Sequence, residues 1–304
     1  MNKSVRAGMA ALAFLFLIPS HPAYAATGRA ECQSMPSKIL AHSVAYCILL
    51  PPTYDAEKTR RYPVLYFLHG LGDNEQMFLH SGGWNMAEDL WEQHQLGEFL
   101  IVTPAAGVSF YINSHDGSVR YEDFMLQEFL PFIEGHYRIR AGRAFRGVGG
   151  ISMGGYGALR LAFRHPELFV SVTAQSAALI DKLPDIALGQ SQKSARMQIL
   201  GDVFGSPPER AFWEANNPLR LARSAKLARL KIYFDCGSED NYGFDAGAES
   251  LHRVLASRLI PHEFHIYPGS HNWVYFAEHL PASLEFHAHA FGLRPSAEQI
   301  ESKH

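Results

Sequence analysis

Short runs of apolar residues alternate along the chain with stretches in which apolar residues recur every three or four positions. The short runs are rich in Val, Ile, Phe and Tyr and are too short for helices, so each predicts a β-strand. They occupy residues 64–68, 99–103, 145–149, 170–174, 230–235 and 263–266, and the helical pattern is clearest over 121–137, 157–163 and 246–258. Strands alternating with helices are typical of an α/β protein with a mostly parallel sheet and helices on both faces.

The first 25 residues carry the pattern of an export signal. Lys3 and Arg6 precede an apolar stretch over residues 7–18, and Ala23-Tyr24-Ala25 fits the small-x-small rule for cleavage. The apolar stretch is too short to span a bilayer. We therefore expect residues 1–25 to be a signal peptide cleaved after Ala25, with an uncleaved anchor as the alternative. The cleaved protein is expected to be secreted or periplasmic and free of the membrane.

Residues 26–304 are expected to form a single domain, because no internal repeat or low-complexity linker divides them. Residues 182–228 lack a strand pattern and contain Pro184, Pro207, Pro208 and Pro218. This span predicts a helical insertion over the edge of the sheet. Its place between predicted strands makes it a candidate wall for a binding pocket.

Composition and charge narrow the class of protein. The chain has 304 residues, of which 47% are hydrophobic and 19% charged, which is the opposite of a disordered composition. The formal net charge is −3, so no basic excess is present to bind nucleic acid. Nothing in the sequence indicates the oligomeric state.

Two of the three cysteines are positioned to form a disulfide. A hairpin centred near residue 39 or 40 places Cys32 opposite Cys47, and export would bring both into an oxidising compartment. The alternative is a pair of buried, unbonded thiols. Cys236 follows a predicted strand and is expected to be a small buried apolar residue.

The sequence Gly150-Ile151-Ser152-Met153-Gly154 matches G-x-S-x-G. The motif alone is weak, but an apolar run precedes it and a helical pattern follows at once. This is the strand–turn–helix context of a nucleophile elbow, in which a Cβ at either glycine would collide with a neighbouring element. The alternative is a glycine-rich connection with a solvated serine.

A serine nucleophile needs a histidine base that is oriented by a carboxylate, and in this architecture the chain order is Ser, Asp or Glu, then His. His271 follows the last predicted strand and is the expected base. The carboxylate is expected in the loop after residues 230–235, at the carboxyl end of a strand. The competing residues there are Asp235, Glu239, Asp240 and Asp245. We favour Asp240, because Asp235 ends the predicted strand and is expected to hydrogen-bond backbone groups in the turn.

An oxyanion hole requires two backbone N–H groups. One is expected from Met153, at the start of a helix where unpaired amides favour an anion. The other is expected from Leu71 in the loop after residues 64–68, which reads His69-Gly70-Leu71-Gly72. The alternative for that loop is an ordinary glycine turn.

These motifs together resemble the esterase-D-type family of α/β hydrolases, which includes S-formylglutathione hydrolases, feruloyl and acetylxylan esterases, enterochelin esterases and mycobacterial mycolyltransferases. The resemblance runs from about residue 34 to 291 and rests on six segments: 69–72, 128–134, 150–158, 165–169, 235–240 and 268–273. It implies an α/β-hydrolase fold with Ser152, Asp240 and His271 as the catalytic triad, in agreement with the residue-by-residue reasoning.

The expected function is that of a secreted serine carboxylesterase, acting on small or polysaccharide-linked esters such as feruloyl or acetyl esters. Alternatives are an acyltransferase with the same triad and a sugar acceptor, and a non-catalytic carbohydrate-binding protein on a hydrolase scaffold. Trp84, Tyr111 and Trp273 are candidate substrate contacts, with Phe110 and Asn113 nearby. No metal or cofactor is expected: His287-x-His289 has no third ligand near it in sequence, and the chain lacks phosphate-loop and dinucleotide fingerprints.

Overall fold

An eight-stranded sheet organises the computed structural model, which describes residues 27–183 and 195–293. The strand order is β1-β2-β4-β3-β5-β6-β7-β8; β1, β2 and β4 pair antiparallel, and every other neighbouring pair is parallel. The strands are β1 (Arg29–Pro36), β2 (Ser43–Leu50), β3 (Val64–Leu68), β4 (Leu100–Pro104), β5 (Arg146–Ile151), β6 (Ser171–Gln175), β7 (Lys231–Glu239) and β8 (Glu263–Ser270). This is the α/β-hydrolase fold that the sequence predicts.

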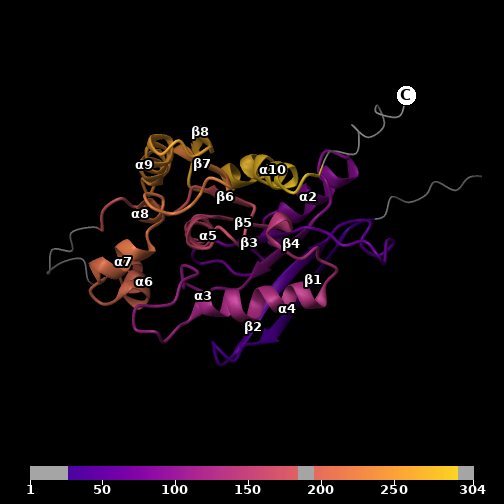
Figure 1. Ribbon diagram of the computed structural model, residues 1–304, viewed down its shortest axis with the longest axis horizontal. Coiled ribbons are helices and arrows are strands. Elements are labelled where there is room, and N and C mark those ends of the chain that lie inside the picture. Colours follow the sequence, from indigo (N-terminus) through magenta and orange to yellow (C-terminus); the bar gives the residue numbers. More distant parts are fainter. Residues whose placement is uncertain (1–26, 184–194, 294–304) are drawn as a thin grey trace, which may run out of the picture.

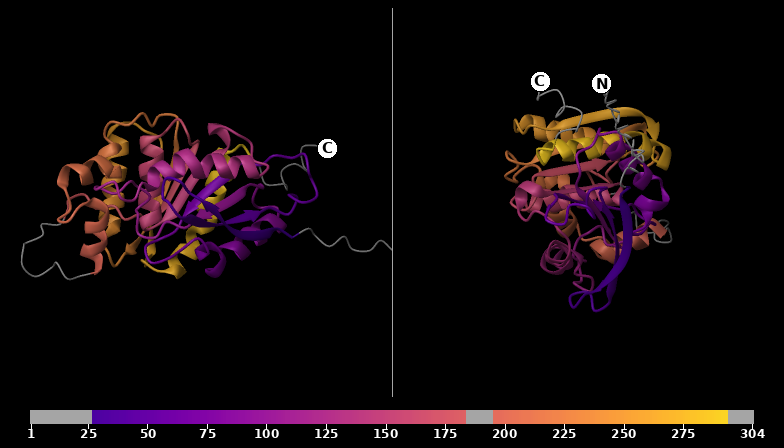
Figure 2. Two further views of the ribbon diagram at one scale, coloured as in Figure 1. Left: turned by 90° about the horizontal axis from the view of Figure 1, so that it is seen from below. Right: turned by 90° about the vertical axis from the view of Figure 1, so that its right-hand side faces the viewer.

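Helices cover both faces of the sheet (Figures 1 and 2). Side chains of α3, η1, α4, α5 and α9 pack with one face in the larger apolar cluster, and α2 and α10 pack with the other face in the smaller one. The helical elements are α1 (Met77–His80), α2 (Gly83–Glu92), α3 (Tyr121–Phe124), η1 (Met125–Phe129), α4 (Leu130–His136), η2 (Arg143–Phe145), α5 (Met153–Arg164), α6 (Ala195–Phe204), α7 (Arg210–Asn216), α8 (Pro218–Leu221), α9 (Phe244–Ser257) and α10 (Trp273–Ala290).

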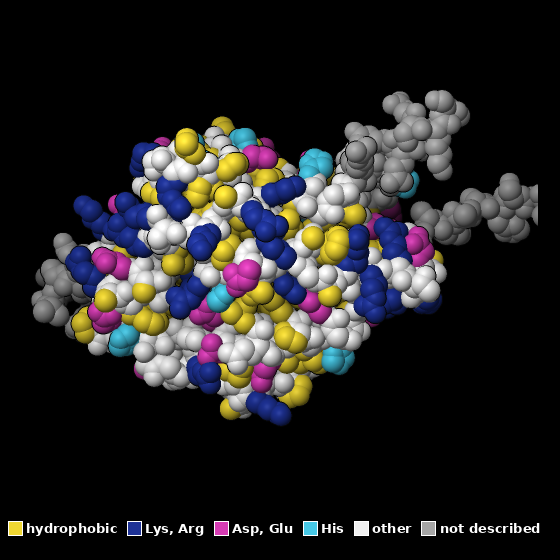
Figure 3. Space-filling model, viewed as in Figure 1, with side chains coloured by type: hydrophobic (Ala, Val, Ile, Leu, Met, Phe, Trp, Pro, Cys, Tyr) yellow, Lys and Arg dark blue, Asp and Glu magenta, His cyan; other side chains and the backbone are white. Residues whose placement is uncertain are grey.

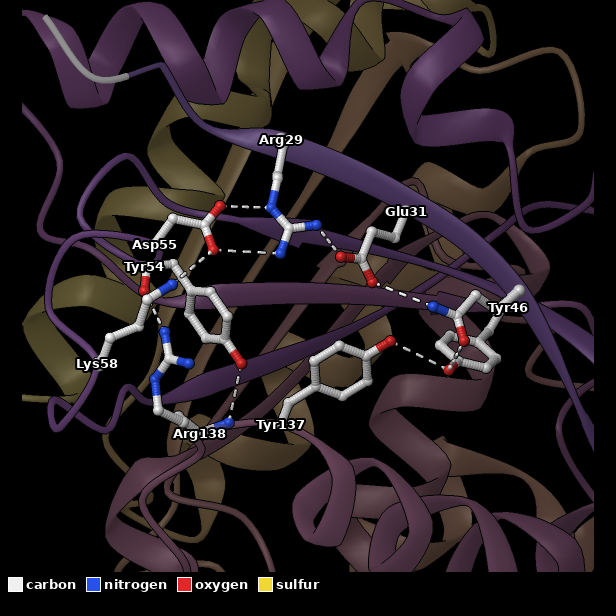
Figure 4. A network of polar contacts seen from close by, with 9 residues as sticks. Arg29, Glu31, Tyr46, Tyr54, Asp55, Lys58, Tyr137 and Arg138 are labelled. Carbon is white, nitrogen blue, oxygen red and sulfur yellow. Dashed lines mark hydrogen bonds and ion pairs between the residues drawn. The ribbon is translucent and has the colours of Figure 1, made fainter.

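The N-terminal hairpin pairs Cys32 with Cys47 across β1 and β2, and the two residues form a disulfide. Polar contacts bind this edge to the rest of the protein (Figure 4): Arg29 donates to Asp55, and Tyr46 shares a hydrogen bond with Tyr137. The ion pairs here are exposed, so each contributes little to stability. The disulfide is the stronger constraint on the hairpin.

Each predicted strand overlaps an observed one, but two strands are longer than predicted. β7 continues to Glu239 and β8 to Ser270, and they pair along this extension with a register shift between Gly237 and Glu239. Asp235 therefore lies inside β7, and the expectation that it ends the strand and bonds to turn backbone is wrong. The predicted helix over 121–137 is a continuous helical run that changes to a π-turn in η1 and ends at His136.

The span predicted as a helical insertion contains α6, α7 and α8 between β6 and β7, whereas residues 184–194 lie outside the described residues. The predicted signal peptide, residues 1–25, also lies outside them. Among the residues that the structure describes, no helix is both long and apolar enough to cross a membrane. On the face shown in Figure 3, basic and acidic side chains are interspersed.

Candidate active site

Ser152 occupies a strained turn between β5 and α5. Its φ of 53° lies in the left-handed region, which is costly for a residue with a side chain. The flanking glycines permit the turn: a Cβ at Gly150 would lie 2.6 Å from the carbonyl carbon of Gly154, and one at Gly154 would lie 2.0 Å from the Leu68 carbonyl oxygen. The collision predicted from the motif is thus present at both positions. Because the turn directly follows β5, it places Ser152 at the carboxyl end of that strand.

Ser152, His271 and Asp240 form one hydrogen-bonded chain. The Ser152 hydroxyl donates to Nε2 of His271 over 2.9 Å, and Nδ1 of His271 donates to Oδ2 of Asp240 over 2.7 Å. Asp240 directly follows β7 and His271 directly follows β8, so the ends of neighbouring parallel strands bring them together. This geometry suits removal of the serine proton by a histidine whose tautomer is fixed by the carboxylate.

Asp240 is held as a carboxylate by its surroundings. Burial by itself would raise its pKa, but hydrogen bonds from His271 and from the backbone amides of Tyr242 and Phe244 outweigh burial and lower the pKa below its usual value. The thiol of Cys236 also lies 3.6 Å from Oδ2. Cys236 is buried and unbonded to another cysteine, as predicted, and burial raises the pKa of its thiol.

The loop after β3 contains Leu71, and hydrogen bonds of the neighbouring His69 hold this loop in place. Both ring nitrogens of His69 form hydrogen bonds: Nδ1 donates to the Gly70 carbonyl over 2.8 Å, and Nε2 accepts from the Ala106 amide over 3.0 Å. A trans peptide points its C=O and N–H in opposite directions, so fixing the Gly70 oxygen also fixes the Leu71 N–H. Burial lowers the pKa of His69, which keeps the ring neutral for this arrangement.

A cavity of about 520 Å³ opens beside the Ser152 hydroxyl. Leu71 and Met153 line it, as do Ser152 and His271. Its other walls are mostly apolar and include Phe110, Tyr156, Ile199, Leu200, Phe204, Trp213, Tyr242, Phe244, Trp273 and Phe276. A cavity of this size and apolar character suits an organic group larger than a few atoms.

The three candidate substrate contacts fall in different places. Trp273 lines the cavity, and its ring nitrogen donates to the Ser81 carbonyl. Tyr111 is fully buried behind the loop that follows β3, where its hydroxyl donates to the His69 carbonyl. Trp84 packs on the other face of the sheet, against Trp91. The structure therefore corrects the expectation of direct substrate contact for Tyr111 and Trp84.

Several cavity residues were not singled out from the sequence. Tyr242 and Phe244 lie two and four residues after Asp240, and Phe276 lies five after His271. Aromatic side chains so close in sequence to the candidate triad residues are the feature that could have identified them as cavity walls. Asn113, named beside Phe110, instead accepts a hydrogen bond from the Asp123 amide.

A second serine–histidine pair lies elsewhere. Ser171 Oγ is 2.8 Å from Nδ1 of His287, whose Nε2 is 3.0 Å from the Thr173 hydroxyl. This pair is sealed between β6 and α10, and burial lowers the pKa of His287 to about 3. His289 is exposed, so the two histidines of the His287-x-His289 motif do not face a common site. The pair at Ser171 has no route for an ester to reach it.

The fold and the elbow serine place the protein among the α/β hydrolases. Within them the chain belongs to the family described as "Putative esterase", whose model matches residues 37–287. An esterase of Mycobacterium tuberculosis is 31% identical over 240 residues, which are 74% of this chain and 51% of the relative. The chain thus spans about half the length of that relative.

Three further comparisons cover most of this chain and most of the other protein. An acetyl esterase of Caldicellulosiruptor saccharolyticus is 25% identical over 259 residues, covering 82% of this chain and 94% of the relative. A solved ferulic acid esterase superposes with a TM-score of 0.75 at 26% identity, covering 87% of this chain and 99% of the other. An S-formylglutathione hydrolase from Agrobacterium tumefaciens, with a TM-score of 0.70 and 20% identity, shares the fold.

Proposed function

We propose that the protein is a serine carboxylesterase that cleaves carboxylic esters through an acyl-enzyme. The observation that carries this proposal is the hydrogen-bonded chain from Ser152 through His271 to Asp240 at the base of an apolar cavity. Membership of the esterase family supports it.

In the first step Ser152 Oγ attacks the ester carbonyl carbon while Nε2 of His271 accepts the hydroxyl proton. Asp240 stabilises the imidazolium that results. When the tetrahedral intermediate collapses, the bond to the alcohol oxygen breaks and His271 returns the proton to the leaving alcohol. Water, activated by the same histidine, then attacks the acyl-serine and releases the acid.

The carbonyl oxygen gains negative charge in each tetrahedral intermediate. The amides of Met153, at the start of α5, and Leu71, oriented through His69, are the proposed donors to this oxygen. Donors held in place before the reaction stabilise charge without having to reorganise. Loss of one such donor typically costs a factor on the order of 10² to 10³ in rate.

The cavity favours an apolar acyl group larger than acetyl. An acetyl group would leave most of about 520 Å³ empty, whereas an aromatic acid could contact Phe110, Phe204 and Trp213. The ferulic acid esterase among the structural neighbours supports aromatic acids such as ferulate as one candidate class. The alcohol, small or part of a polysaccharide, would lie toward the open side of the cavity.

We further propose that the protein is exported and works in an oxidising compartment. The sequence pattern of residues 1–25 and the Cys32–Cys47 disulfide support this location.

The function is tested with purified protein, a series of p-nitrophenyl esters from acetate to octanoate, and methyl ferulate. The expected result is ester hydrolysis by the wild type, none above background for Ser152→Ala, and covalent labelling of Ser152 by a fluorophosphonate. Hydrolysis of no ester, together with absence of labelling, would refute the proposal.

A further inference from the structure

Three buried polar side chains lie behind the triad, on the side of the sheet that faces α10. They are Gln175 at the end of β6, Asp235 inside β7 and Tyr275 in the first turn of α10, and we name them the sub-triad cluster. Gln175 and Asp235 are register partners, so their side chains project from the same face. The Tyr275 hydroxyl donates to Oδ1 of Asp235 over 2.6 Å, and the Gln175 side-chain amide donates to the Phe276 carbonyl over 3.3 Å.

Each member of the cluster belongs to, or holds, an element that carries one residue of the triad. The backbone carbonyl of Gln175 accepts from the Ser152 amide over 2.9 Å. Asp235 lies inside β7, five residues before Asp240, which directly follows that strand. Tyr275 lies four residues after His271, at the start of the helix that follows it. The cluster therefore links the backbone segments that position all three triad residues.

The ring of Tyr275 is also packed against the turn that leads to His271. A Cβ at Gly269 would lie 2.8 Å from the Tyr275 ring, so only a glycine backbone fits over it. Asn272 caps α10 by accepting from the Tyr275 amide over 3.1 Å. Because ring, amide and hydroxyl of Tyr275 are each held, a shift of this side chain would move the turn that carries His271.

We propose that Asp235 and Tyr275 are positioning residues for His271: their hydrogen bond holds the start of α10 against β7 and so keeps the imidazole between Ser152 and Asp240. This inference rests on the proposed function. Neither residue lines the substrate cavity, so both act through His271. The interaction is fully buried, where a hydrogen bond is not weakened by competing water.

The protonation state of Asp235 allows asparagine to imitate it in the test. Burial raises its pKa to about 7, against the lowering effect of hydrogen bonds from tyrosines. At pH 6 the carboxyl is therefore mainly uncharged, and Asp235→Asn reproduces its size, charge and ability to accept from Tyr275. Asp235→Ala removes the acceptor of this hydrogen bond, and Tyr275→Phe removes its donor.

The experiment measures kcat and KM for p-nitrophenyl butyrate at pH 6, normalised to sites counted by fluorophosphonate. We expect Tyr275→Phe and Asp235→Ala to lower kcat ten- to a hundredfold with KM within about twofold, and Asp235→Asn to stay within about threefold of the wild type. The matched control is Tyr46→Phe, which removes the hydroxyl of another buried tyrosine from its bond to Tyr137. That control should lose stability but keep kcat.

Wild-type kcat in the folded fraction of Tyr275→Phe would overturn the inference, as would equal losses in Asp235→Asn and Asp235→Ala. If Tyr275→Phe does not fold, the two Asp235 variants alone decide the question. Failure of the proposed function itself would look different, because the wild type would then show no hydrolysis sensitive to Ser152→Ala.

Discussion

The hydroxyl of Ser152 lies 2.9 Å from Nε2 of His271, although 119 residues separate them in the chain. Pairing of β5, β6, β7 and β8 in one parallel sheet creates this contact, because the carboxyl ends of neighbouring strands share an edge. The site depends on the register of the sheet as much as on the residues themselves.

Among the described residues, two serine hydroxyls hydrogen-bond to histidine rings, and substitution of these serines should have different effects. Ser152→Ala removes the proposed nucleophile and should lower kcat/KM for p-nitrophenyl butyrate by a factor on the order of 10⁴ or more. Ser171→Ala removes only a buried contact to His287 and should leave kcat within about threefold. Steady-state kinetics at equal concentrations of folded protein make the comparison. A greater loss of activity from Ser171→Ala than from Ser152→Ala would assign the active site to Ser171 instead.

Filling the cavity should change substrate preference without harming the chemistry. Ile199 lines the cavity, so Ile199→Trp should lower kcat/KM for octanoate and ferulate esters at least tenfold while acetate stays within about threefold. The control, Ile266→Trp, adds the same bulk at an exposed position of β8 that is not among the cavity walls. The ratio of octanoate to acetate activity is the measurement, and equal ratios in both variants would contradict the cavity assignment.

The hairpin disulfide should stabilise the fold without taking part in the reaction. Its cysteines are 15 residues apart, so replacing both Cys32 and Cys47 by Ala should cost about 3 kcal/mol in unfolding free energy. Chemical denaturation measures this loss, and kcat at 25 °C should not change. Cys236→Ala is the control for loss of a buried thiol, and its effect on stability should be smaller.

Glu122 should make stability fall in acid. Burial acts to raise its pKa, but hydrogen bonds from His165 and Arg160 and the nearby Arg164 outweigh it and lower the pKa to about 2. A lowered folded-state pKa contributes stability above the unfolded value of 4.5, and this is lost as pH falls toward 2. The contribution is about 3 kcal/mol.

The matching variant is Glu122→Gln, which removes the titration and leaves buried Arg160 without its counter-charge. It should be less stable than the wild type at pH 7 and should lose less additional stability between pH 5 and pH 3. Denaturation midpoints across that range give the two slopes. Parallel slopes would exclude Glu122 as the acid-sensitive group.

Much of the sheet could be predicted because its central strands are short, apolar and β-branched. The ends of β7 and β8 could not, since Gly237, Pro268 and Gly269 usually mark turns. Here the two segments pair with each other and remain extended. Such pairing between distant segments is not encoded in local pattern.

Helix α10 is not among the clearest helical patterns of the sequence, for a related reason. Its inward face carries Tyr275, Ser283 and His287, which bond to polar groups on β6 and β7, and Pro281 lies inside it. A helix whose buried face is partly polar lacks the apolar stripe that identifies helices in sequence. The structure brings together Ser152, Asp240 and His271 as named from motifs, whereas aromatic identity could not tell which side of the sheet Trp84 would face.

The proposed triad and one part of the cavity wall come from separate parts of the chain. Ser152, Asp240 and His271 follow strands of the sheet, whereas Leu200, Phe204 and Trp213 belong to helices inserted between β6 and β7. A graft of these helices from another scaffold would therefore exchange that part of the wall and leave the strand ends that hold the proposed triad in place.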